Sequence, residues 1–150
     1  MSEEPRTIPV LSVVITAPDV GVALEFYAFQ VGEAWYGVPD VGEGPLDYIM
    51  GPYDSIEQLV RCYLALEAQD YERLIVTLMK EIERKRRAGG DPVIEAVVKA
   101  LEEVIEDYRK VAKNLRRALQ ERTYRYWVWE GDGPLRLVLE GGSGAVQKRA

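Results

Sequence analysis

The sequence contains no histidine, and this absence excludes more chemistry than any other feature of its composition. Histidine is the usual general base near neutral pH, the usual activator of a nucleophilic serine or cysteine, and the commonest metal ligand. The single cysteine, Cys62, leaves no intramolecular disulfide and no cysteine-rich zinc site. We therefore assign no catalytic residue, no metal ligand and no cofactor, and we favour a non-enzymatic role while leaving the question of enzymatic activity open.

Long hydrophobic runs are also missing. No apolar stretch approaches the ~20 residues that a membrane-spanning helix needs. The chain opens with Met1-Ser2-Glu3-Glu4, which is acidic where a secretory signal would be basic. We expect a cytoplasmic protein without a membrane partner.

Basic residues are nearly absent from the first part of the chain. Residues 1–58 hold ten acidic residues and one basic residue, whereas the remaining 92 hold 18 basic and 15 acidic residues. The net charge is −6 over 150 residues, of which 47% are hydrophobic and 29% charged. This composition is typical of one globular domain, expected over residues 1–140. Residues 141–150 open with Gly-Gly-Ser-Gly and predict a flexible tail.

Two long amphipathic segments predict helices over residues 54–88 and 91–122. Asp54 followed by Glu57 has the pattern of a capping box at the start of the first helix. The run from Gly89 to Pro92 ends that helix and starts the next, and so short a connection makes the helices antiparallel. Whether residues 54–88 form one helix or two stays open. In the second helix, apolar residues recur at coiled-coil spacing: Ile94, Val98, Leu101, Ile105, Tyr108, Ala112, Leu115 and Leu119.

Strands are predicted on both sides of this helical hairpin. Alternating apolar residues and β-branched content predict them over about residues 8–16, 21–31 and 34–38, and the C-terminal segments 123–130 and 135–140 predict a β-hairpin. The expected fold is α+β, with one mostly antiparallel sheet packed on a long antiparallel helical hairpin. The order of the strands is not predicted.

Two groups of residues are candidates for binding, since clustered aromatic and charged side chains are typical of contact surfaces. The first surrounds a turn-rich loop at residues 39–47 and consists of Trp35, Tyr36, Asp40, Glu43, Asp47, Tyr48 and Tyr53. The second lies in the basic and aromatic stretch 109–129 and consists of Arg116, Tyr124, Tyr126, Trp127 and Trp129.

The leading functional hypothesis is a non-enzymatic protein-interaction module, a small acidic regulator or inhibitor that works by surface contact with a partner protein. One alternative is a small-molecule-binding domain or minor enzyme with a carboxylate-lined pocket between sheet and helices. Another is nucleic-acid binding through residues 109–129, because bases and rings together hold phosphates and stack on nucleobases. A computationally designed or stabilised sequence without a natural function is a further alternative, and a homo-oligomer is compatible with each.

Overall fold

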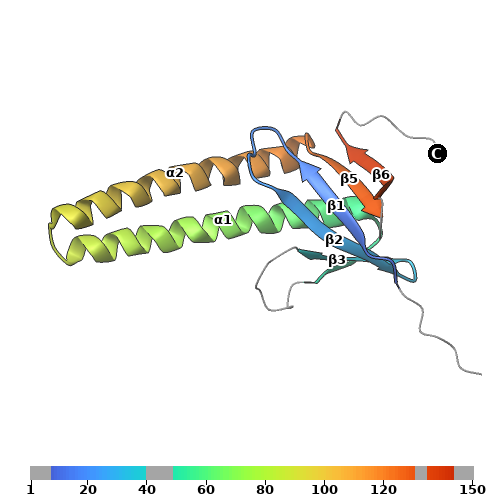
Figure 1. The fold of residues 1–150 in the computed structure, drawn as a ribbon, viewed down its shortest axis with the longest axis horizontal. Coiled ribbons are helices and arrows are strands. Elements are labelled where there is room, and N and C mark those ends of the chain that lie inside the picture. The colour runs from blue at the N-terminus through green and yellow to red at the C-terminus, as the bar shows by residue number, and fades with distance from the viewer. Residues whose placement is uncertain (1–7, 40–48, 131–134, 144–150) are drawn as a thin grey trace, which may run out of the picture.

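The computed structural model describes residues 8–39, 49–130 and 135–143. Four of the candidate binding residues, Asp40, Glu43, Asp47 and Tyr48, lie outside the described residues, as does the predicted tail from residue 144. The predicted fold class is confirmed: a six-stranded antiparallel sheet packs on a pair of antiparallel helices (Figure 1). The elements are β1 (Leu11–Thr16), β2 (Leu24–Val31), β3 (Ala34–Pro39), β4 (Met50–Tyr53), α1 (Ile56–Arg87), α2 (Pro92–Glu121), β5 (Arg125–Glu130) and β6 (Arg136–Gly142).

The sheet has the strand order β4-β3-β2-β1-β5-β6, so β1 joins the N-terminal strands to the C-terminal hairpin. Val13 of β1 lies opposite Phe26 of β2 and Val128 of β5, and all three side chains are fully buried. Because side chains alternate along a strand, this register turns one apolar face of every central strand towards the helices.

α1 is one continuous helix of 32 residues, which settles the question left open by its sequence. The predicted capping residue was wrong. Ser55 is the N-cap, and its hydroxyl accepts from the Gln58 amide at 3.3 Å. Asp54 instead donates its amide to the Gln58 carboxamide, which frees Glu57 from the capping role. The cap of α2 is as predicted, since Asp91 accepts from the amide of Val93 at 2.8 Å.

The helical hairpin extends well beyond the sheet. Beneath the sheet, the main core includes Leu59 and Leu64 of α1 and Leu115 of α2. A second, separate core lies farther along the hairpin and consists of Ile75, Ile82, Val98 and Ile105. We call this projecting part, residues 71–87 and 92–108, the arm (Figure 1). At 1.5 Å per residue, 17 helical residues make the arm about 26 Å long.

The last described strand runs two residues beyond the predicted end of the hairpin. Gly141 and Gly142, which the sequence grouped with the tail, pair with Tyr126 and Arg125 of β5. Ser143 then donates its amide to the carbonyl of Tyr124 at 2.8 Å. Within the described ranges no helix is long and apolar enough to cross a membrane.

Candidate functional site

The sheet divides the first predicted group of binding residues between its two faces. Trp35 lies opposite Tyr53 across β3 and β4, and both side chains pack against the main core. Tyr36 points to the other face, where its ring stacks on that of Phe29 with centroids 5.7 Å apart. The three described members of this group therefore do not form one surface.

The second predicted group is divided in the same way. Tyr124, directly before β5, and Tyr126, within it, are buried on the helix side, whereas Trp127 is half-buried on the opposite face. Arg116 lies on α2 and forms an ion pair with Glu72 of α1 at 2.8 Å. Strand alternation separates residues that are adjacent in sequence, so no basic and aromatic patch spans residues 109–129.

A polar network connects the start of α1 to β5. Both carboxylate oxygens of Glu57 accept tyrosine hydroxyls, one from Tyr124 and the other from Tyr126 at 2.8 Å. Arg61, one turn later on α1, donates to the Tyr124 hydroxyl at 3.1 Å and lies 5.8 Å from the centre of that ring. The network ties the helix to the strand where the two meet.

This network has the electrostatics of a structural link. Burial and then the hydrogen bond to Glu57 raise the pKa of Tyr126 above its ordinary value, and the same two causes raise the pKa of Tyr124. A raised pKa keeps both hydroxyls protonated, as donors, at neutral pH. Each carboxylate oxygen of Glu57 thus accepts a hydroxyl from within the protein, as expected of a structural link.

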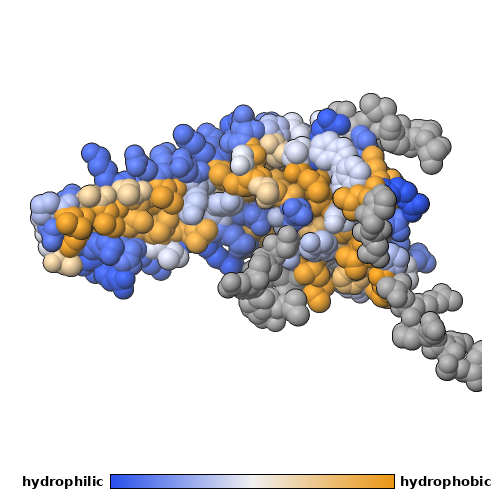
Figure 2. All heavy atoms as spheres, viewed as in Figure 1, coloured by the Kyte–Doolittle hydropathy of each residue, from blue (hydrophilic) through white to orange (hydrophobic). Residues whose placement is uncertain are grey.

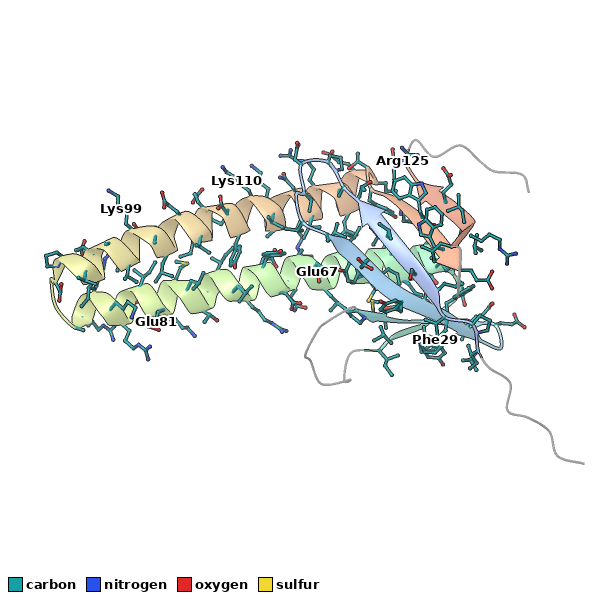
Figure 3. All side chains as sticks on the ribbon, in the orientation of Figure 1. Phe29, Glu67, Glu81, Lys99, Lys110 and Arg125 are labelled. Carbon is teal, nitrogen blue, oxygen red and sulfur yellow. The ribbon has the colours of Figure 1, made fainter. Side chains whose placement is uncertain are left out.

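The second face of the sheet carries five aromatic rings, and among the described residues no helix covers it. We call it the open sheet face. Arg125 lies over the ring of Trp127 at 5.1 Å. Figure 3 labels Arg125 on β5 and Phe29 on β2, well apart along the sheet. The five rings belong to Tyr27, Phe29, Tyr36, Trp127 and Trp129. They are mostly half-buried, because neighbouring side chains cover one another.

A second uncovered surface lies on the arm, on the side where the sheet packs. Helical spacing continues the row of Val60 and Tyr63, which lie beneath the sheet, into Tyr71 and Leu74, which lie beyond it. We call the resulting surface the arm face; it consists of Tyr71, Leu74, Leu78, Val93, Val97, Leu101, Val104 and Tyr108. Figure 2 shows it as an apolar band that runs along the hairpin between polar margins.

Three of the eight side chains of the arm face are exposed to a degree that is high for large apolar residues, and the other five are half-buried. Leu74 is 45% exposed, Val93 69% and Val97 39%. At the base of the arm, the rings of Tyr71 and Tyr108 meet edge-on with centroids 5.2 Å apart. Contiguous exposed apolar surface of this kind marks an interaction site more often than scattered single residues do.

The reverse side of the arm holds a groove of about 660 Å³ with the side chains of Met79, Ile82 and Ile105 along it. Its rim is charged, but the charges pair with one another: Arg86 contacts Glu102 at 3.1 Å, and Arg109 contacts Glu106 at 3.6 Å. In the part of the chain that the structure describes, no group of three or more potential metal ligands gathers there or elsewhere.

The sequence contained a signal for the arm face that the candidate groups did not use. Valines at 93, 97, 104 and 111 each stand one position before a residue of the coiled-coil spacing. A two-helix seam needs only the apolar residues of that spacing, whereas an extra row beside it is typical of helices that bury a wider face in a bundle.

Comparison of the chain with known protein families, with curated proteins and with solved structures finds no match to any of them. The arm face and the open sheet face are therefore the two surfaces of the protein that bear on its function.

Proposed function

We propose that the protein is a non-enzymatic interaction module, a small acidic regulator or inhibitor acting in the cytoplasm, and that a partner protein binds it along the arm face. The observation that carries the proposal is the continuity of this face. The same row of α1 that buries Val60 and Tyr63 against the sheet goes on as Tyr71, Leu74 and Leu78 with nothing described above it.

Burial explains why such a face would take a partner. Covering apolar surface contributes about 25 cal/mol per Å². Both helices of the arm supply long, rigid surface. This protein therefore loses little conformational entropy when a partner helix packs on the arm face. A helical segment lying along the arm would complete the layer that the sheet occupies at the base.

In-cell photo-crosslinking tests the proposal. A photoreactive phenylalanine analogue is placed at Val97 on the arm face or, as the matched control, at Val76, which is 50% exposed on the other side of the arm. We expect protein adducts from position 97 and few from position 76. Equal or absent adducts at both positions would contradict the proposal.

The open sheet face supports a second candidate function, the binding of single-stranded nucleic acid. Aromatic rings on a sheet stack on bases, and Arg125 beside Trp127 adds a cation next to a stacking surface. Glu25 and Glu140 border the same rows of the sheet and oppose a phosphate backbone. Fluorescence anisotropy of a labelled oligothymidine at low salt tests this candidate: it requires binding that Trp127→Ala weakens at least tenfold, and absence of binding excludes it.

A further inference from the structure

We infer that the partner on the arm face is a second copy of this chain, lying antiparallel so that the two arms form a four-helix bundle. The inference rests on the proposed function and names its partner. It is carried by three properties of the arm: the layer in which the sheet sits, the distribution of charge from tip to base, and the size of the apolar face.

The sheet decides the direction of the second copy. It sits on the same side of the hairpin as the arm face, because Val60 and Tyr63, in the same helical row as Leu74, pack in the main core beneath it (Figures 1 and 2). A parallel copy would bring its own sheet against this sheet and hold the two arms apart. An antiparallel copy meets no such obstacle, because packed layers are about 10 Å apart and its arm fills the layer beyond the end of the sheet.

This arrangement places equivalent helices against each other. The two-fold axis passes near Leu78 of α1 and Leu101 of α2, which lie at the same level of the hairpin. On α2, Val97 of one copy then faces Val104 of the second copy. On α1, the end that carries Lys85 reaches the region of Asp70 in the second copy.

The charges along α1 are complementary in the antiparallel arrangement. Near the tip of the arm, Arg84 to Arg87 are four consecutive basic residues that share three acidic partners, so basic charge is in excess there. At the base, Glu67 and Asp70 form no salt bridge with any described residue. Figure 3 shows Glu67 on α1 where the helix passes out from under the sheet. An antiparallel copy brings the basic tip of α1 to this acidic base twice.

The area of the face sets the expected strength of the dimer. A face about 26 Å long and two helices, or about 18 Å, wide covers roughly 470 Å² per copy, hence on the order of 950 Å² in the pair. Specific interfaces begin near 1,000–1,200 Å². The estimated area lies just below this range, so the dimer is expected to be weak.

Sedimentation equilibrium of the purified full chain tests the inference. We expect a monomer–dimer equilibrium that Leu74→Lys and Val97→Lys each weaken at least tenfold. The matched control Val76→Lys, which adds the same charge on the reverse side of α1, should change it less than threefold. Circular dichroism confirms that each variant folds. Because Leu74 and Val97 lie on different helices, the inference can be tested with either variant if the other fails to fold.

Charge reversal then tests the direction. Asp70→Lys and Lys85→Asp should each weaken the dimer about threefold to tenfold at low salt, and the double variant should recover most of the loss. Additive losses would overturn the antiparallel arrangement. A chain that stays monomeric at about 200 µM would overturn the inference. In the photo-crosslinking experiment, adducts of another protein at position 97 would still support the proposed function, so the two failures are distinguishable.

Discussion

Replacing Glu57 with alanine should destabilise the protein far more than the loss of an acidic residue near a helix start usually does. Glu57 accepts the hydroxyls of Tyr124 and Tyr126, which are 0% and 5% exposed. Without it, both hydroxyls lose their acceptor inside the protein. Leaving a buried donor unpaired costs about 1–3 kcal/mol, so two of them cost roughly 2–6 kcal/mol. The free energy of unfolding of a domain is about 5–15 kcal/mol, so this is a large fraction of it.

Urea unfolding followed by tryptophan fluorescence measures this loss, because Trp35, Trp127 and Trp129 all lie in the sheet. Glu57→Gln keeps one acceptor oxygen and should lose about half as much. Glu95→Ala is the matched control: Glu95 also lies in the first turn of a helix, and its removal should cost less than about 1 kcal/mol. A loss for Glu57→Ala no larger than that for Glu95→Ala would refute the structural role of the network.

Three further predictions concern the same elements. Gly141→Ala should destabilise by about 1–3 kcal/mol in urea unfolding, because an added Cβ would overlap the ring of Tyr126 and push its hydroxyl away from Glu57; an unchanged midpoint would contradict this packing. Burial, followed by the charge of Asp70, raises the pKa of Glu67, so the folded protein disfavours the ionised form of this carboxyl. Glu67→Gln should therefore stabilise the protein at pH 7, and the gain in free energy of unfolding should shrink as the pH falls towards 4. A gain that does not change with pH would contradict this. Burial also raises the pKa of Tyr126 above its unfolded value of about 10. The contribution of this group to the free energy of unfolding should therefore be fully present below pH 10 and fall as the pH rises further, by at most about 1.4 kcal/mol per pH unit. In Tyr126→Phe the free energy of unfolding should fall less steeply between about pH 9 and 11.

Much of the fold followed from local pattern. The turn from Gly89 to Pro92 and the spacing from Ile94 to Leu119 are signals carried by neighbouring residues, and they fixed the helical hairpin. The strand order could not be predicted in this way. That β1 lies between β2 and β5 depends on packing between segments more than 100 residues apart.

The candidate residues show the same limit. Trp35 and Tyr36 are neighbours in sequence, but strand alternation sends one to the core and the other to the open sheet face. The sequence predicts Glu57 as a capping residue. Its pairing with Tyr124 and Tyr126 joins parts of the chain 67 and 69 residues apart, so no local pattern indicates it. The arm face was missed because its exposure depends on where the sheet ends, which no local pattern gives.

Within the described part of a single chain, the arm is supported at its base, and this gives it mechanical leverage. Its own core of Ile75, Ile82, Val98 and Ile105 makes it stiff along its length, while the main core beneath the sheet acts as the fixed support. Over a length of about 26 Å, a rotation of about 10° at the base moves the tip by roughly 4–5 Å. A force applied near Arg86 therefore exerts a large torque on the junction between the arm and the sheet. Conversely, a small change in packing around Leu115 would displace the tip of the arm by a large distance.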